Sequence, residues 1–470
     1  MKKFFPVLRD HPVFEKIISS LSPEEVFSCF ASREKASFLN SSLESDAARY
    51  SFIGIEPFFS MESKGSFMNV TLLGQKIKAF GSPLKVLKSA AGAYKITNNT
   101  PFPFISGGIG YLSYEAKNLI EELPAPPVDN LGIPDIYFVF YRCILIFDKQ
   151  SPGEFYASVI ELETPSSKKA ADIISSVKSA IKHVPGPLAD IIKNSSLGIE
   201  SNFSKKEYVK AVEKILEHIK AGDIYQACLS QRFRAEWKRP GYELYLKLNQ
   251  LNPSPFSAYI EAGDISIISS SPELFMRRRG NTIETRPMKG TRPAGRVKSE
   301  DEKIKAELEK SAKDIAELLM IVDLERNDIG KIAIPGTVRL EEDRRIERHP
   351  TVFQAISVIK GTVKDDIDNV DILEAVFPGG SITGCPKIRA MEIINDIETC
   401  ARGVYTGCIG YLSFHGTMDM NIAIRTMTLK GRDLYFHAGG GIVSDSDPEE
   451  EYEETLVKAR ALMSAIEDKP

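Results

Sequence analysis

Hydrophobic and polar residues follow two periodic patterns along this chain, and each pattern predicts a different kind of element. Stretches rich in aromatic and β-branched residues, bounded by Gly, Pro or Asn, predict strands at 49–62, 107–115 and 136–148. From 164 to 200 the composition changes to small and polar residues, which predicts a helix that ends before the Pro-Gly-Pro of 185–187. This segment is therefore interpreted as the connection between two portions of the chain.

The portion after residue 200 opens on a well-marked helix. Ser204 and Glu207 have the spacing of a capping box, and Gly222 is a stop signal at the other end. The apolar stripe between them consists of Tyr208, Val212, Ile215, Leu216 and Ile219. The same reasoning predicts strands within 256–277, a long helix near 301–324, strands near 404–414, 420–429 and 432–438, and a last helix from Pro448 to about Ile466.

Two short sequences occur once in each portion. The stretch GGIGYLSYE (107–115) recurs as GCIGYLSFH (407–415), and GIEPFFSM (54–61) resembles SSPELFMR (270–277). Similar strand units in both portions predict an α+β fold with two large, mostly antiparallel β-sheets that face each other and are flanked by helices. We expect residues 1–165 and 200–470 to form the two portions and to interleave in one globule.

Composition and charge restrict the kinds of partner. The 470 residues are 43% hydrophobic and 26% charged, and the net charge of -4 argues against nucleic acid or an anionic membrane as the main partner. No apolar run approaches the roughly 20 residues that span a bilayer, and Arg9 and Asp10 interrupt any signal-peptide core. The six cysteines form no CxxC pair. We therefore expect reduced thiols and a cytoplasmic location.

Acidic residues gather on two predicted helices. Asp314 and Glu317 are three apart and share a helix face. Glu451, Glu454 and Lys458 lie along one side of the last helix. Carboxylates from two helices suit Mg²⁺, which keeps water and substrate oxygens at its other positions. Two solvated helix faces are the alternative, and the sequence does not show whether these helices meet.

Lys289 stands in the stretch IETRPMKGTRPAG (283–295), close to Arg286 and Arg292. The simplest interpretation is a solvated lysine in a turn. The alternative is a reactive amine, kept unprotonated by burial and by the neighbouring positive charge.

Two glycine-rich stretches also lie near basic residues. HAGGGIVSDSDP (437–448) places three glycines directly after a predicted strand, where exposed backbone amides can bind a carboxylate or phosphate. FPGGSITGCPK (377–387) is a second glycine-rich turn, and it ends in a lysine. Arg425 is predicted at the end of a strand, where its guanidinium can form two parallel hydrogen bonds with a carboxylate. Neither GxxxxGK[ST] nor a helix-opening GxGxxG occurs, which argues against nucleotide binding.

Taken together and in this order, the motifs resemble those of the chorismate-utilising enzymes. The segments that carry the resemblance are SPELF, ETRPMKGTRPAG, AELLMIVDLERNDIG, FPGGSITGCPKIRAMEII, RGVYTGCIGYLSF, NIAIRT, AGGGIVSDSDPEEEYEET and KARAL. They run from about 200 to 465, so residues 200–470 resemble the chorismate-binding catalytic portion. Residues 1–165 are similar to the N-terminal portion of anthranilate synthase component I, through SLESDAARYSFIG and GGIGYLSYE. The family's fold, two large antiparallel sheets flanked by helices, agrees with the repeated strand units.

Two residues distinguish the members of this family. Gln226 occupies the position at which the water-adding members carry a lysine base, and glutamine cannot deprotonate water. Lys289 stands where the anthranilate synthases have alanine and the aminodeoxychorismate synthases have lysine. The resemblance therefore implies component I of an aminodeoxychorismate synthase, which serves p-aminobenzoate and folate biosynthesis. Anthranilate synthase component I and a non-catalytic tryptophan-binding regulatory subunit are the alternatives.

The resemblance also implies a role for each residue. Glu317 and Glu454 hold Mg²⁺, with Asp314 and Glu451 close behind, and the metal binds the ring carboxylate of chorismate. Lys289 attacks C2 while Glu273 protonates the departing 4-hydroxyl, and ammonia then displaces the lysine at C4. The residues expected to hold the substrate are Gly290, Thr291, Tyr405, Arg425, Gly439, Gly440, Gly441 and Lys458.

The ammonia requires a further partner. The sequence contains no glutaminase pattern of a nucleophilic cysteine followed by His-x-Glu, so a separate glutamine amidotransferase subunit is implied.

Two other positions bear on the resemblance. Gln354 stands where many members have a histidine, which leaves any proton transfer at that position in doubt. Ser45, Pro255 and Phe256 resemble the family's tryptophan pocket. The sequence does not decide whether tryptophan occupies this pocket.

Overall fold

The strands form one extensive antiparallel system. The structure, a computed structural model, describes residues 5–467 except 10, 44, 125–126, 165–167, 185–197, 294, 296 and 349–351. The strands of the first portion are β1 (Val13–Ile18), β2 (Ser37–Asn40), β3 (Tyr50–Lys64), β4 (Phe67–Leu72), β5 (Gln75–Phe80), β6 (Gly107–Leu112), β7 (Ile136–Asp148) and β8 (Glu154–Val159).

The second portion contributes more strands, and they include Lys289 and the three consecutive glycines 439–441. They are β9 (Glu200–Ser201), β10 (Gln226–Glu236), β11 (Phe256–Ala262), β12 (Ile265–Ser271), β13 (Leu274–Arg279), β14 (Thr282–Arg286), β15 (Met288–Pro293), β16 (Arg339–Arg348), β17 (Val352–Thr362), β18 (Gly384–Cys385), β19 (Cys408–Ser413), β20 (Met418–Ile422), β21 (Thr426–Lys430) and β22 (Asp433–Ile442).

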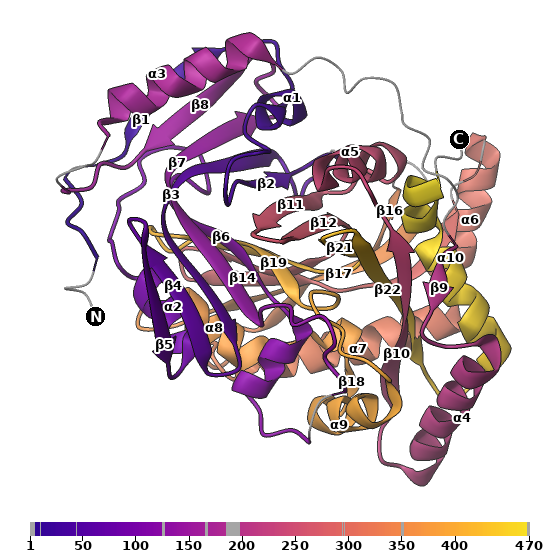
Figure 1. Ribbon diagram of the computed structural model, residues 1–470. Coiled ribbons are helices and arrows are strands. Elements are labelled where there is room, and N and C mark those ends of the chain that lie inside the picture. The colour runs from indigo at the N-terminus through magenta and orange to yellow at the C-terminus, as the bar shows by residue number, and fades with distance from the viewer. Residues whose placement is uncertain are drawn as a thin grey trace.

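The helices lie outside this strand system (Figure 1). They are α1 (Pro23–Ser28), α2 (Pro83–Ala91), α3 (Ala170–Ala180), α4 (Lys205–Ala221), α5 (Gly241–Leu251), α6 (Lys298–Lys310), α7 (Ala312–Gly330), α8 (Asn369–Val376), α9 (Lys387–Ile397) and α10 (Pro448–Glu467), with 3-10 turns η1 (Tyr114–Leu119), η2 (Ile181–His183) and η3 (Gly380–Ile382). An α+β fold with a large antiparallel sheet is therefore confirmed. Among the described helices, none is long and apolar enough to cross a membrane.

The pairing of the strands refines the prediction of two facing sheets. Every described pairing is antiparallel, and the pairings join all 22 strands into one hydrogen-bonded network. The two copies of the first repeated sequence, 107–115 and 407–415, lie side by side, because β6 pairs with β19 and Gly110 lies opposite Gly410 (Figure 1). The two copies of this sequence are therefore adjacent antiparallel strands of one sheet, related by a local two-fold axis. Hydrogen bonding does not separate the strands into two sheets, so that division stays a prediction.

Both faces of several strands are buried, in different parts of the core. Phe52 of β3 and Ile267 of β12 belong to one cluster, to which both portions of the chain contribute. Their neighbours Ile53 and Ile268 point the other way, into a second cluster. Helices α1, α3, α5 and α10 cover that second cluster. Strands β3 and β12 are therefore packed against the core on both faces.

Local helix signals predicted some boundaries and missed others. Ser204 caps α4 in a capping box with Glu207, and Gly222 ends the helix in the left-handed region at φ 83°. The single helix predicted near 301–324 is wrong, because the chain breaks at Ser311 into α6 and α7. Ser311 accepts a hydrogen bond from the Asp314 amide, so it caps α7. The Pro-Gly-Pro of 185–187 lies outside the described residues.

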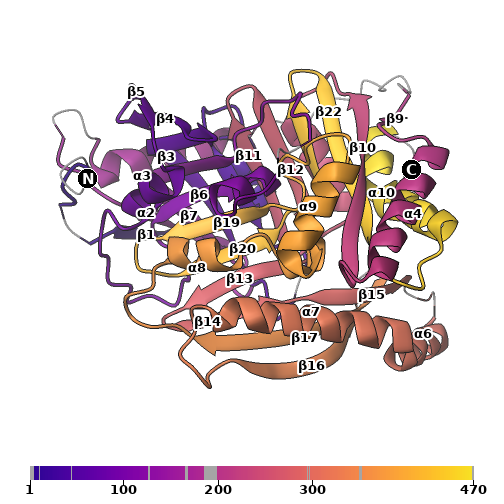
Figure 2. The ribbon, with the colours of Figure 1, turned by 90° about the horizontal axis from the view of Figure 1, so that it is seen from below.

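Two helices bring the acidic residues to the strand system. Helix α7 packs on β15 and β17, and α10 packs on β22 (Figure 2). Strand β22 pairs with β10 along its length. The ends of β10, β15 and β22 and the faces of α7 and α10 therefore surround one region, which contains Lys289.

Candidate functional site

Lys289 lies in strand β15 rather than in a turn. The pairing of β15 with β17 shifts register between Lys289 and Thr291, and Gly290 between them has φ 71°. The side chain of Lys289 is only 18% exposed, and its Nζ lies 3.0 Å from Oε2 of Glu317. A Cβ added to Gly441 would lie 2.9 Å from the same Nζ. The amine therefore ends inside the molecule, between α7 and the backbone of β22.

The prediction that positive charge lowers the pKa of Lys289 is wrong. Arg286 pairs with Asp46 and Glu284, and Arg292 pairs with Asp314, so carboxylates balance both guanidinium groups. Burial alone would lower the pKa of Lys289, but the carboxylate of Glu317 raises it above its ordinary value. In this arrangement Lys289 is an ammonium ion.

The four predicted carboxylates lie around this ammonium, but they do not form one cluster. Glu317 of α7 contacts Lys289, while Glu454 of α10 pairs with Lys458 at 2.6 Å. Lys458 and Lys289 hold the pKa of Glu454 below its ordinary value against the effect of burial. Glu451 is buried and accepts a hydrogen bond from Ser446 at 2.6 Å, and burial raises its pKa. Asp314 faces Arg292 at 2.8 Å.

Two carboxylates of this region could hold a metal ion. Among the described residues, no group of three or more His, Cys, Asp or Glu side chains converges so as to hold a metal ion. Glu317 and Glu454 nevertheless come from two helices and both act on the Lys289 ammonium, so a positive charge already lies close to both. Mg²⁺ commonly needs only one or two carboxylates besides water and substrate oxygens. Glu317 and Glu454 satisfy that requirement.

The three glycines lie within a strand and not after it, contrary to the prediction. Gly439, Gly440 and Gly441 pair with Ser230, Leu229 and Cys228 of β10. A Cβ on Gly440 would lie 2.9 Å from Oε2 of Glu451, and one on Gly441 would lie 2.8 Å from Nε2 of Gln226. The absence of side chains therefore gives the charged groups room to approach the backbone.

Glu273 is a buried carboxyl group near enough to Lys289 for the ammonium to act on its pKa. It lies between β12 and β13 and accepts a hydrogen bond from the Ser381 hydroxyl at 2.7 Å. Burial raises its pKa to about 7, although Ser381 and Lys289 act in the opposite direction. A carboxyl group with this pKa keeps a proton near neutral pH and can donate it, as a general acid must.

Arg425 and Tyr405 lie at the ends of neighbouring strands. Arg425 has φ 49°, a strained value for a residue with a side chain. Its guanidinium donates to Asn252 at 3.0 Å and forms no ion pair with any described residue, while burial lowers its pKa. Tyr405 stacks on His437 with ring centroids 5.0 Å apart. A buried guanidinium without a carboxylate is a suitable partner for an anionic substrate.

The remaining predicted substrate residues surround the same region. Lys458 donates to the Gly439 carbonyl at 3.0 Å. A Cβ on Gly290 would lie 2.9 Å from Oδ1 of Asp314. Thr291 lies opposite Gln354 in the β15–β17 pair, and its side chain lies outside the description.

Sequence reasoning missed several polar residues of this site. Ser381 contacts Glu273, and Arg402 forms a buried ion pair with Glu398 at 2.7 Å behind Tyr405. Glu325 is buried further along α7. Ser381 lies in the glycine-rich turn that the sequence singled out, but no spacing signal connects it to Glu273, which is 108 residues away.

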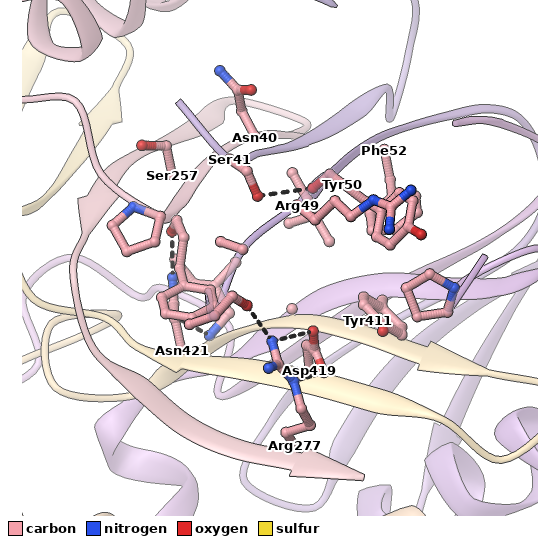
Figure 3. Close-up of a pocket in the computed structure, with 18 of the residues that line it drawn as sticks. Asn40, Ser41, Arg49, Tyr50, Phe52, Ser257, Arg277, Tyr411, Asp419 and Asn421 are labelled. Carbon is pink, nitrogen blue, oxygen red and sulfur yellow. Dashed lines mark hydrogen bonds and ion pairs between the residues drawn. The ribbon is translucent and has the colours of Figure 1, made fainter. Parts of the chain in front are cut away.

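A cavity of about 310 Å³, shown in Figure 3, has none of the predicted catalytic or metal-binding residues in its wall. It is lined by Pro255 and Phe256 as predicted, together with the segment 46–50 and Asn421. Ser45, which was predicted with them, is not among the lining residues. Its hydroxyl is buried and has no hydrogen-bond partner among the described residues. Arg277 and Arg279 both pair with Asp419 at the cavity wall. Burial would raise the pKa of Asp419, but these guanidinium groups keep it below its ordinary value.

Comparisons with known proteins agree on the kind of protein. The family model described as "chorismate binding enzyme" matches residues 42–464. Anthranilate synthase component 1 of Acetivibrio thermocellus is 38% identical over 437 residues, which cover 90% of this chain and 87% of that protein. Aminodeoxychorismate synthase component 1 of Bacillus subtilis (strain 168) is 36% identical over 423 residues, 89% of each. The crystal structure of anthranilate synthase component I from Streptococcus pneumoniae TIGR4 has a TM-score of 0.78 at 32% identity and covers 96% of this chain and 99% of that one. Relatives with the two names are similarly identical, so overall identity does not decide the product.

Proposed function

Because the chain belongs to the chorismate binding enzyme family, we propose that it is component I of an aminodeoxychorismate synthase, which aminates chorismate at C4. One observation carries this choice. Position 289, where the family's anthranilate synthases have alanine, holds a lysine whose amine ends inside the candidate site, 3.0 Å from Glu317 and beside Gly441. A surface lysine in a turn would not be placed in this way.

The proposed mechanism uses Lys289 as the nucleophile and Glu273 as the general acid. Attack requires the neutral amine, so the Lys289 ammonium must first leave its ion pair with Glu317 and release one proton to water. Lys289 Nζ then forms a bond to C2 as the C4–O bond breaks, and the proton of Glu273 leaves with the 4-hydroxyl as water. Ammonia next adds at C4 and expels the lysine, which gives 4-amino-4-deoxychorismate with its enolpyruvyl group retained. Arg425 supplies the guanidinium for a substrate carboxylate.

Glu317 and Glu454 are the residues that would hold Mg²⁺. The ion would supply positive charge for the ring carboxylate of chorismate. Asp314 and Glu451 surround these two residues, and Lys458 neighbours Glu454.

Gln226 supports amination rather than hydration. It lies at the start of β10, fully buried, with Nε2 close to Gly441. Its Oε1 is buried and has no hydrogen-bond partner in the described part of the chain. An unpaired amide oxygen can accept a hydrogen bond from ammonia but cannot remove a proton from water.

The proposal predicts the product and the nitrogen source. With chorismate, Mg²⁺ and ammonium, the purified chain should form aminodeoxychorismate, identified by mass. Glutamine should support the reaction only after a glutamine amidotransferase subunit is added. Formation of anthranilate, which fluoresces, would contradict the assignment, as would glutamine-dependent turnover by the chain alone.

Anthranilate synthase component I is the second candidate function. Several relatives have this name, including that of Acetivibrio thermocellus. The same incubation separates the two, because anthranilate has lost the enolpyruvyl group and aminodeoxychorismate has not. A non-catalytic tryptophan-binding subunit would form neither product.

We also propose that the cavity of about 310 Å³ binds tryptophan. Its guanidinium groups, the Asp419 carboxylate and the aromatic ring of Phe256 suit a zwitterionic aromatic amino acid (Figure 3). Titration calorimetry should detect binding of L-tryptophan, and Phe256→Ala should weaken it roughly tenfold through lost ring contact. Phe80→Ala is the matched control, since Phe80 is 73% exposed on another hairpin. Equal affinity in both variants would place the ligand elsewhere.

A further inference from the structure

Asn252 has a buried side chain that the mechanism above does not use. It opens the stretch NPSPFSAY (252–259), whose Pro255 and Phe256 line the cavity of about 310 Å³, but Asn252 is not among the lining residues. Its backbone amide ends helix α5 by donating to the Leu248 carbonyl at 2.8 Å. Its side chain is 8% exposed. A buried polar side chain outside the cavity requires partners of its own.

The amide oxygen of Asn252 binds the guanidinium of Arg425. Oδ1 accepts a hydrogen bond from Nη1 of Arg425 at 3.0 Å. Within the described part of the chain, this guanidinium has no other hydrogen-bond acceptor and no carboxylate partner. A guanidinium carries five N–H donors in a rigid fork, and Asn252 takes one of them. The remaining donors are therefore available to a ligand.

The other polar atoms of Asn252 attach it to Ser270. Nδ2 donates to the Ser270 hydroxyl at 2.7 Å, and this hydroxyl donates in turn to the Asn252 carbonyl. The backbone amide of Ser270 donates to the Arg425 carbonyl at 3.1 Å. The backbone and the side chain of Arg425 are thus bound to the same two residues. This double attachment offsets the strain of the left-handed backbone at Arg425, whose φ is 49°.

The turn that carries Arg425 is also attached to the proposed general acid. The amide of Ile422, three residues before Arg425, donates to the Glu273 carbonyl at 3.0 Å. The backbone of this turn is therefore fixed relative to Glu273. The rotatable bonds of the Arg425 side chain remain, and the contact with Asn252 restricts them.

The neutrality of Asn252 matters as much as its position. A carboxylate at the same place would form an ion pair with Arg425 and compete with any anionic ligand. An amide oxygen accepts a hydrogen bond and leaves the positive charge of the guanidinium uncompensated. Burial lowers the pKa of Arg425, which is the expected effect on a cation that lacks a carboxylate partner. Arg425 is thus oriented by a neutral group and keeps its charge for an anion.

We infer that Asn252 is a positioning residue that directs the Arg425 guanidinium towards a carboxylate of the substrate and leaves its full charge for that carboxylate. The inference rests on the proposed function in one respect, namely that Arg425 binds a substrate carboxylate. It does not depend on whether ammonia adds at C4 or at C2.

Asn252→Asp tests the inference, because it keeps the size of the side chain and adds a charge. The new carboxylate should pair with Arg425, and the Ser270 hydroxyl can rotate to donate to it. The substrate carboxylate must then displace this partner, so KM for chorismate should rise roughly 10- to 100-fold, the range that one hydrogen bond to a charged group contributes. The kcat should stay within about threefold of wild type, since Arg425 binds the ground state and the transition state alike. Chorismate consumption with Mg²⁺ and ammonium measures both constants.

Asn252→Ala distinguishes positioning from a structural role. It removes the partner of Arg425 without adding a charge, so KM should rise less than in Asn252→Asp, by roughly three- to tenfold. A residue that only stabilises the fold would show the reverse order, because Asp keeps hydrogen bonds that Ala loses. Asn130→Asp is the matched control, since Asn130 is exposed and accepts a hydrogen bond from Arg232 at 2.9 Å, and it should keep the wild-type KM.

An unchanged KM in Asn252→Asp would overturn the inference, and so would a larger rise in Asn252→Ala than in Asn252→Asp. If circular dichroism shows that Asn252→Asp does not fold, Asn252→Ala decides, and an unchanged KM there would overturn the inference. Because chorismate consumption is followed, formation of anthranilate would refute the proposed function and leave this comparison standing. A chain that consumes no chorismate would refute both.

Discussion

Lys289→Ala should lower the kcat for aminodeoxychorismate formation by roughly a thousandfold or more, with a much smaller change in KM. The amine acts in the transition state, so its loss affects the chemical step more than ground-state binding. Without the covalent relay, ammonia would have to substitute at C4 directly. Addition of ammonia at C2 remains open to the variant, so part of the product should shift towards the anthranilate-type intermediate. Steady-state kinetics and product analysis by mass measure both effects.

Lys305→Ala provides the control for this experiment. Lys305 is 53% exposed on α6 and pairs with Glu309 at the surface, so its removal should leave the rate unchanged. If Lys289→Ala formed aminodeoxychorismate at the wild-type rate, Lys289 would have only a structural role.

Glu317→Gln and Glu454→Gln should each cause a large loss of turnover. Removing a residue that only supports a metal ligand reduces activity roughly 10- to 100-fold, and removing a ligand itself should reduce turnover by more than this. Each change removes a negative charge that the proposed Mg²⁺ requires. Glu317→Gln also leaves the buried Lys289 ammonium without its carboxylate. Turnover measured against Mg²⁺ concentration checks the effect, and circular dichroism checks the fold.

Asp323→Asn is the matched control for the metal prediction. Asp323 lies on the same helix α7 but is 80% exposed and pairs only with Arg326 among the described ion pairs. We expect it to retain wild-type turnover at every Mg²⁺ concentration. Wild-type turnover at low Mg²⁺ in Glu317→Gln or Glu454→Gln would show that the metal assignment is wrong.

Features that depend on local sequence could be predicted. The capping box of Ser204 and Glu207 and the stop at Gly222 involve only neighbouring residues, and all three have the predicted roles in α4. The strand predicted at 136–148 coincides with β7. The break at Ser311 escaped prediction because the apolar and acidic pattern continues through it, and only the cap of α7 reveals it.

Features that depend on distant contacts could not be predicted. The sequence places Arg286 close to Lys289, which predicted a positive charge acting on the lysine. In the structure Arg286 pairs with Asp46, 240 residues earlier in the chain. Glu317 reaches Lys289 because α7 packs on β15, and no sequence spacing shows that contact. The glycines of 439–441 were predicted to follow a strand, but they pair with β10 and belong to strand β22 itself. The chemistry of the residues was readable from the sequence, whereas their charge balance required the structure.

Trapping the covalent intermediate tests the central proposal most directly. The purified chain would be mixed with chorismate and Mg²⁺ in the absence of ammonia, quenched, and analysed by intact-protein mass spectrometry. We predict an added mass equal to chorismate minus one water, and peptide mapping should place it within 283–295, on Lys289. Lys289→Ala should show no such adduct. An adduct at another residue, or none under conditions in which added ammonium restores aminodeoxychorismate formation, would contradict the proposal that Lys289 is the nucleophile.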